Sequence, residues 1–148
     1  MKWVTRENAA VDRVACPWLI NRFIDPEAEF IYVNKDEVLK VAEREGAHSY
    51  DAPGAKYTHR DGKCSFEALV EDFDLAGDAA LVRLAEIVHA ADVSEDLNAA
   101  PEGAGLSAIA GGFRILHGTE DHRKIELETP MYDCMTRSTL GVSSRLRD

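Results

Sequence analysis

The chain is 148 residues long, with 45% hydrophobic and 30% charged residues, and this balance excludes an intrinsically disordered or collagen-like protein. Its 27 acidic residues outnumber its 17 basic ones, which gives a formal charge of −10 and a surface that repels phosphate backbones and anionic membranes. We therefore expect one domain over residues 1–148 that contacts neither nucleic acid nor membrane directly. No window approaches the roughly 20 apolar residues that a membrane span needs, so we expect a cytoplasmic protein.

The N-terminal third alternates between strand and helix patterns. Apolar and aromatic residues predict strands at residues 2–7 and 28–33, and a weaker third strand at 47–51. Helical spacing of apolar residues separates these strands at residues 11–24 and 35–46, and the second helix ends on a glycine. Alternation of this kind favours a small parallel sheet of about three strands with right-handed crossovers.

A polar loop at residues 51–64 separates this sheet from a helical C-terminal half. Loops of that length with proline and glycine often carry function. Beyond the loop, the 3.6-residue apolar period predicts four helices, and Pro130 should kink or split the last of them. These helices span residues 65–76, 78–93, 101–118 and 119–140, and their starts are marked by Ser65, Asp78, Pro101 and Thr119. The fold class predicted is therefore α+β and mostly helical.

The cysteines indicate free thiols. Cys16, Cys64 and Cys134 are an odd number without a Cys-x-x-Cys pair, which argues against a disulfide framework and against a thiolate zinc ribbon. Cys16 precedes a proline at the start of a helix, as in thioredoxin-like redox sites, but the second cysteine of that motif is missing. We favour the alternative that Cys16 and Trp18 are buried and anchor the first helix to the sheet.

The polar loop and the helix that follows it contain the first candidate site, formed by His59, Arg60, Cys64 and Glu67. A thiol near a helix N-terminus and an arginine should have a lowered pKa. Cys64 could then bind a metal or act as a catalytic residue that reduces an oxidant. The alternative is that Cys64 caps or packs the helix and His59 bonds a carbonyl group.

The next helix contains the second candidate site. Glu86, His89 and Asp92 recur every three residues and so project from one helix face. A Glu-x-x-His pair is the unit that carboxylate-bridged metal sites in helical bundles use, and His89 is also a candidate catalytic residue. The alternative is a partly exposed polar stripe, because one copy of so short a motif occurs by chance in many helices.

A third pair, His122 and Glu126, has the i, i+4 spacing that lets both side chains reach one cation. The alternative is a solvated helix face, because this segment is highly charged. If the helices form a bundle, the predicted metal ligands converge. They are His59, Glu67, His89, Asp92 and His122. Nitrogen and oxygen ligands suit a divalent transition metal, and the ligand types are compatible with zinc, iron, manganese and nickel alike.

An oxyanion site would need a local group of arginines, because the acidic chain as a whole repels free anions. We predict Arg13 and Arg60, with the thiol of Cys16, as the residues that bind a substrate or anion. The alternative for Arg13 is a structural ion pair with Asp12 or Asp25.

Four segments resemble one family in the same order along the chain. They are VDRVACPWLINRFIDPEAEFIYV, THRDGKCSFEALV, LAEIVHAADV and MYD. These segments look like the signatures of the C-terminal domain of ChrB-type chromate-resistance proteins, and the resemblance covers nearly the whole chain. Longer members carry an N-terminal winged-helix region that binds DNA and a C-terminal half usually taken as the sensing part. The resemblance implies that this chain corresponds to the second half, so that a partner chain would supply any DNA contact.

We therefore expect a metal- or oxyanion-sensing domain of chromate resistance without its own DNA-binding region. One alternative is a small metalloenzyme or thiol-dependent redox enzyme acting on an oxidant, with Cys64 or His89 at its centre. Another is a non-catalytic protein-interaction domain that forms a homo-oligomer or docks a partner. The sequence lacks a Walker loop, GxSxG, HExxH and a dinucleotide fingerprint, which disfavours nucleotide hydrolysis, serine hydrolysis, zincin proteolysis and nicotinamide chemistry.

Overall fold

Three short parallel strands form the centre of the N-terminal half. In the computed structural model, which describes residues 1–140, β1 (Lys2–Arg6) lies between β2 (Glu29–Val33) and β3 (His48–Ser49). Both neighbours pair with β1 in parallel, so all three strands run toward the same edge of the sheet. The parallel three-stranded sheet and the mostly helical class confirm the fold that the sequence predicts.

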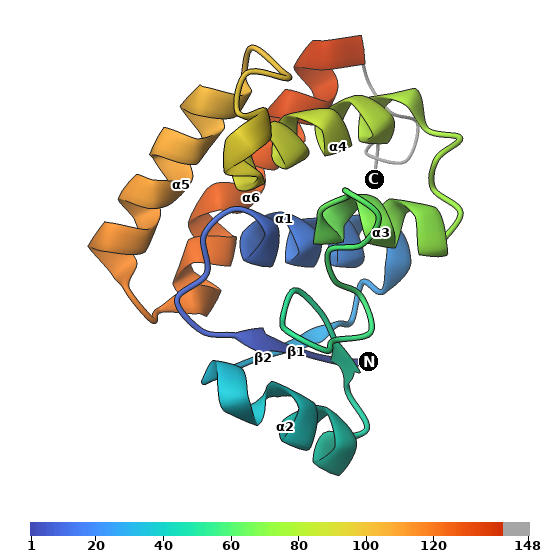
Figure 1. The fold of residues 1–148 in the computed structure, drawn as a ribbon, viewed down its shortest axis with the longest axis vertical. Helices are drawn as coiled ribbons and strands as arrows, with labels where there is room; N and C mark the ends of the chain where they lie inside the picture. Colours follow the sequence, from blue (N-terminus) through green and yellow to red (C-terminus); the bar gives the residue numbers. More distant parts are fainter. Residues whose placement is uncertain (141–148) are drawn as a thin grey trace.

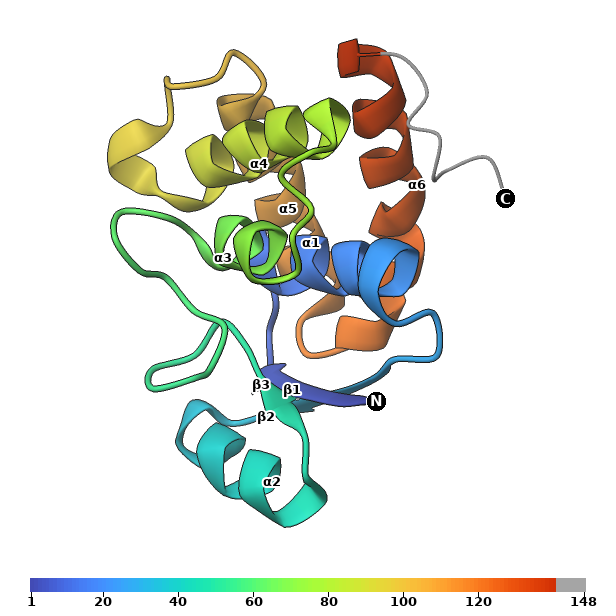
Figure 2. The same ribbon diagram turned by 90° about the vertical axis from the view of Figure 1, so that its right-hand side faces the viewer.

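Different helices cover the two faces of the sheet (Figures 1 and 2). α1 (Asp12–Leu19), which continues as a π-helical turn at Ile20–Ile24, lies on one face, and α2 (Val38–Glu45) lies on the other. Successive side chains of a strand point to opposite faces. Buried Trp3 therefore joins the main core on the α1 side, whereas buried Val4 belongs to the small core that β1 forms with α2.

The C-terminal half, as far as residue 140, consists of four α-helices. They are α3 (Ser65–Asp72), α4 (Ala79–Asp92), α5 (Gly103–His117) and α6 (Asp121–Leu140). Of these, α3, α4 and α6 pack against α1, and α5 packs against α4 and α6 (Figure 2). The ring of Trp18 in α1 lies 6.5 Å from that of Phe66 in α3 and 6.1 Å from that of Tyr132 in α6, measured between ring centroids. All three residues are fully buried, and their contact fixes the positions of α1, α3 and α6 relative to one another.

α6 contradicts one of the two outcomes predicted for Pro130, a kink or a split of the last helix. The helix continues through Pro130 and is not split there. Buried side chains on both sides of the proline, among them Lys124 and Tyr132, hold the two halves of the helix against the core. Tertiary packing thus outweighs the local cost of the proline. Within residues 1–140, no helix is both long and apolar enough to cross a membrane.

α5 approaches α4 closely at its first residue, Gly103. A β-carbon at this position would lie 2.7 Å from the Cβ of Ala90 and 2.7 Å from the carbonyl oxygen of Leu97. Both distances are too short for a real contact, so the packing of the two helices requires glycine here. The contact holds the part of α4 that carries His89 and Asp92.

Candidate metal centre

The start of α3 is capped by Asp12, a residue far away in the sequence. The amides of Ser65 and Phe66 donate to the two carboxylate oxygens of Asp12 at 2.7 and 3.2 Å. Amides in the first turn have no partner within their own helix, and a carboxylate there also meets the positive end of the helix dipole. Because Asp12 opens α1, this contact holds the starts of α1 and α3 side by side.

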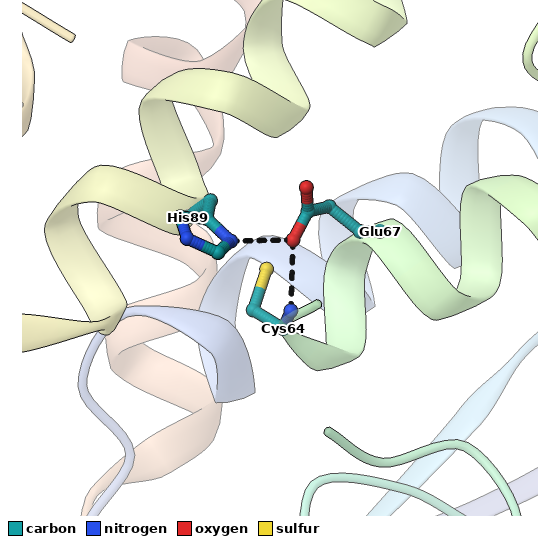
Figure 3. Close-up of side chains that lie close together, drawn as sticks. All are labelled: Cys64, Glu67 and His89. Carbon is teal, nitrogen blue, oxygen red and sulfur yellow. Dashed lines mark hydrogen bonds and ion pairs between the residues drawn. The ribbon is translucent and has the colours of Figure 1, made fainter. Parts of the chain in front are cut away.

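Three side chains meet where the start of α3 faces the C-terminal part of α4. They are Cys64, Glu67 and His89, which we call the thiol triad (Figure 3). Oε2 of Glu67 accepts a hydrogen bond from the amide of Cys64 at 2.8 Å and lies 2.6 Å from Nδ1 of His89. One ligand atom from each residue lies within 4.8 Å of the other two. The triad thus offers sulfur, oxygen and nitrogen to one cation.

Both ring nitrogens of His89 face carboxylates. Nδ1 faces Glu67, and Nε2 lies 2.7 Å from Oδ2 of Asp96. Burial acts to lower the pKa of His89, but the hydrogen bonds with Asp96 and Glu67 outweigh it and raise the pKa above its usual value. Two carboxylates, one at each ring nitrogen, thus favour the protonated form of the imidazole. A metal ion at Nδ1 would replace that proton, while Asp96 would keep the ring oriented.

Asp12, His59 and Asp92 form a second group, which we call the aspartate triad. Nε2 of His59 lies 3.0 Å from Oδ2 of Asp92 and 3.3 Å from Oδ2 of Asp12. A third carboxylate, that of Asp51, lies 3.4 Å from the same nitrogen. His59 comes from the polar loop, so three carboxylates on α1, α4 and the loop meet at one imidazole.

Three carboxylates crowd around the single imidazole of His59 in and beside the aspartate triad. Hydrogen bonds with Asp12 and Asp51 raise the pKa of His59 to about 10, so the ring is a cation at neutral pH. Burial, together with the charges of Asp12 and Asp51, nevertheless raises the pKa of Asp92 to about 7. Burial also raises the pKa of Asp12. Arg6 and Arg13 pair with Asp51. Within the described residues, Asp12 and Asp92 share only His59 as an ion-pair partner, so a further cation beside these two carboxylates would relieve their crowding.

The two triads are neighbours. Asp92 follows His89 by three residues on α4, so both side chains lie on one helix face. Asp12 caps the same turn of α3 that Cys64 begins. A pocket of about 440 Å³ between α3 and α4 adjoins the thiol triad, and Glu67 is one of its lining residues. Three glutamates and one lysine are its charged lining residues, and this balance suits the entry of a cation.

The structure brings together four of the five predicted metal ligands: Glu67 and His89 in the thiol triad, and His59 and Asp92 in the aspartate triad. His122 lies in neither triad. Its ring packs edge-on against the ring of Tyr32 at 5.5 Å between centroids.

The predicted anion ligands do not form one site. Arg60 makes hydrogen bonds with both carboxylate oxygens of Asp72, at 3.0 and 2.5 Å. Arg13 lies 3.6 Å from a carboxylate oxygen of Asp51, which differs from both partners suggested by the sequence. Cys16 is fully buried in the main core, as in the anchoring alternative.

The expected lowering of the Cys64 pKa is wrong. Burial raises the pKa of this thiol, and the nearby carboxylates of Asp12, Glu67 and Asp92 raise it further. Arg60 points instead to Asp72. The helix N-terminus favours a thiolate, but it is outweighed by desolvation and by three anions. Without a bound cation, Cys64 is a neutral thiol.

Sequence reasoning missed Asp12 and Asp51 as members of the site. Asp12 was considered only as an ion-pair partner of Arg13, and Asp51 only as part of a loop. Asp12 contacts the site through residues distant in sequence, and Asp51 contacts His59 across the polar loop that carries both, so neither belongs to a local spacing motif. The one available signal was the presence of acidic residues beside elements that are otherwise buried, since buried charges need partners.

Comparisons with known proteins identify the same family that the four signature segments resemble. The family model described as "ChrB, C-terminal domain" matches residues 3–139. The chain is similar to Protein ChrB of Cupriavidus metallidurans (strain ATCC 43123 / DSM 2839 / NBRC 102507 / CH34), with 40% identity over 113 residues, which cover 76% of this chain and 33% of that protein. The matched part thus spans about a third of the relative's length. No solved structure matches the chain.

Proposed function

Since this chain belongs to the family of ChrB C-terminal domains, which is associated with chromate resistance, we propose that it is a sensing domain that binds a divalent transition metal at the thiol triad. One observation carries the proposal. Cys64, Glu67 and His89 place three ligand atoms of different types within 4.8 Å of one another. Glu67 holds the group together, because its Oε2 makes hydrogen bonds with both the amide of Cys64 and Nδ1 of His89.

The chemistry of the ligands indicates the class of metal. A thiolate, an imidazole and a carboxylate together suit zinc, and also iron, manganese or nickel with less preference. Metal binding would remove the proton from Cys64, because a coordinating thiol is deprotonated. Three protein ligands leave a position for a further ligand, and the pocket that Glu67 lines adjoins the triad.

The aspartate triad is the second candidate for the metal site. Its ligands are oxygen and nitrogen, which suit manganese or iron better than a thiol-selective metal. The pKa of about 7 at Asp92 supports this candidate, because it reflects burial and, after it, the nearby charges of Asp12 and Asp51, and a divalent cation would offset both effects.

Metal binding would act as a signal by joining separate elements. The thiol triad connects the start of α3 with the C-terminal part of α4, and the aspartate triad connects α1, α4 and the loop that carries His59. A bound ion would strengthen these connections and thereby order the loop. We propose that the DNA contact in such a response is made by a partner chain or by another part of a longer protein.

The enzyme alternatives differ in how well the site suits them. A thiol-dependent redox enzyme needs a thiolate, whereas burial and three carboxylates raise the pKa of Cys64. A small metalloenzyme requires the same ligands as a sensor and is distinguished from it only by turnover. For an interaction domain, the supporting feature is the exposure of two apolar residues on α5, Ile115 (85% exposed) and Leu116 (78% exposed).

The proposal is tested by titrating chelator-treated protein with Co²⁺ and following the absorption that arises when a thiolate binds this ion. Wild-type protein should develop the thiolate-to-metal band with saturation near one equivalent. Cys64→Ser and His89→Ala should abolish the band, whereas His122→Ala should leave it intact because His122 belongs to neither triad. Saturable binding without a thiolate band, lost in Asp92→Asn, would move the metal to the aspartate triad. An absence of saturable binding would refute both candidates.

A further inference from the structure

A basic pocket of about 270 Å³ lies near the carboxyl ends of β1 and β2, although the chain as a whole carries a formal charge of −10. Its lining combines cationic side chains with short polar ones and one carboxylate. The lining residues are Arg6, Glu7, Asn8, Arg13, Asn34, Lys35 and Arg114. Four of the seven are cationic, so this pocket has the opposite charge to the pocket beside Glu67.

Several elements of the fold converge on this pocket. Arg6 is the last residue of β1, and Lys35 follows the end of β2. Arg13 comes from the first turn of α1, and Arg114 comes from the last turn of α5. The carboxyl ends of parallel strands are a common position for ligand sites in α/β folds.

Two of the arginines are positioned by neighbouring groups. The side chain of Arg13 is only 13% exposed and lies 3.6 Å from Asp51. The amide of Asn8, oriented so that both its atoms are satisfied, accepts a hydrogen bond from Nε of Arg114 at 3.2 Å. Its nitrogen in turn donates to the carbonyl of Gly118 at 3.2 Å. Arg13 and Arg114 are thus partly preorganised, which lowers the entropic cost of binding a ligand.

The cations of the pocket lack enough anionic partners. A single carboxylate, that of Asp51, serves both Arg6 at 3.3 Å and Arg13 at 3.6 Å. Within the part of the chain that the structure describes, Lys35 and Arg114 lie beyond ion-pair distance of any carboxylate. Burial lowers the pKa of Arg13, and the charges of Arg6 and Arg114 lower it further, which shows that the positive charges crowd one another.

We propose that this pocket binds a small tetrahedral dianion of the class of sulfate, hydrogenphosphate and chromate. Four cationic side chains, set against the carboxylates of Glu7 and Asp51, leave an excess of two positive charges, which matches a dianion. Guanidinium groups donate paired N–H groups to such oxyanions. The site uses none of the residues of the two triads, so it does not depend on the proposed metal.

Asp51 nevertheless links the pocket to the aspartate triad. Its Oδ2 faces Arg6 and Arg13, whereas its Oδ1 accepts a hydrogen bond from the hydroxyl of Ser65 at 2.7 Å and lies 3.4 Å from His59. An anion that pairs with the two arginines competes with this carboxylate for them. The same carboxylate would then be freer to attract a cation on its other side.

The test is calorimetric titration of chelator-treated protein with sodium sulfate and sodium hydrogenphosphate, at constant ionic strength. Sodium nitrate provides the monoanion control, and sodium chromate is measured last because it can oxidise thiols. Sulfate should bind saturably and about tenfold or more tightly than nitrate, since each charge-assisted hydrogen bond adds affinity. A phosphate monoester that binds more tightly than free phosphate would overturn the assignment to a free ion.

Matched variants locate the site. Arg114→Ala should weaken sulfate binding by about tenfold or more, and Lys35→Ala should also weaken it. Both side chains are exposed, so neither change threatens folding. Arg123→Ala, which removes an exposed arginine on α6, should leave sulfate binding unchanged. Equal affinities for sulfate and nitrate, or equal sulfate affinity in wild type and Arg114→Ala, would refute the proposal. The metal affinity of Arg114→Ala and Lys35→Ala should equal that of the wild type. A failure of the anion proposal can therefore be distinguished from a failure of the metal proposal.

Discussion

Replacement of Gly103 by alanine should destabilise the protein. The added β-carbon would lie 2.7 Å from the Cβ of Ala90 and 2.7 Å from the carbonyl oxygen of Leu97, so a rigid backbone atom and a β-carbon would have to move. Such overpacking costs about 1–3 kcal/mol, and the better helix propensity of alanine returns at most about 1 kcal/mol. We expect a net loss of about 1–2 kcal/mol in the free energy of unfolding, and a decrease in Tm of about 2–8 °C.

Urea denaturation followed by circular dichroism measures this loss. Gly105→Ala is the matched control, because it lies in the same helix and its added β-carbon would have no neighbour within 4 Å. That variant should be neutral or stabilised by up to about 1 kcal/mol. If Gly103→Ala were as stable as Gly105→Ala, α5 would not approach α4 as described, and the support of α4 beneath His89 would have to be revised.

Three further predictions concern charged residues. Both carboxylate oxygens of buried Glu128 are without a hydrogen-bond partner in the described part of the chain, and burial raises the pKa from 4.5 to about 8. The folded state therefore holds a proton that the unfolded state releases, and stability should fall by up to about 1.4 kcal/mol per pH unit as the pH rises from 4.5 to 8. Glu128→Gln should remove this dependence in denaturation series, and an unchanged slope would contradict it. Arg60→Ala should cost no more than about 1 kcal/mol, because its pair with Asp72 is partly exposed, and it should not alter sulfate affinity in calorimetry. Asp51→Asn should tighten sulfate binding in calorimetry, because it removes the carboxylate that competes with the anion for Arg6 and Arg13. Weaker sulfate binding in this variant would contradict that competition.

Local patterns were sufficient to predict most of the fold. The alternation of short strands with helices predicted the parallel sheet, because a parallel pair needs a crossover between its strands. The apolar period predicted all four C-terminal helices. Of the two outcomes predicted for Pro130, a kink or a split, the split is wrong because buried residues on both sides hold α6 to the core, and the local cost of proline does not include this packing.

The candidate site was predictable where its members follow each other at helical spacing and, for His59, where a histidine lies in a long polar loop. Glu67 lies three residues after Cys64, and Asp92 lies three residues after His89, so each pair was visible from spacing. The two pairs come together only because α3 packs against α4, and local spacing does not predict that packing. Asp12 and Asp51 enter the site through tertiary contacts alone.

The basic pocket also forms through tertiary contacts that local sequence patterns do not predict. Arg6 and Arg114 are 108 positions apart in the sequence and meet only because α5 ends near the edge of the sheet. Arg60, the predicted second arginine of an anion site, instead forms two hydrogen bonds with Asp72 on α3, and it does not line the basic pocket.

The central claim is that the thiol triad binds a transition metal, and elemental analysis tests it most directly. Untagged protein, purified without chelators, should be analysed by inductively coupled plasma mass spectrometry beside Cys64→Ser, His89→Ala and the control His122→Ala. We expect near-stoichiometric zinc, iron, manganese or nickel in the wild type and the control, and its loss in both triad variants. A wild-type protein without metal, which also fails to retain any of these ions after incubation and desalting, would contradict the claim.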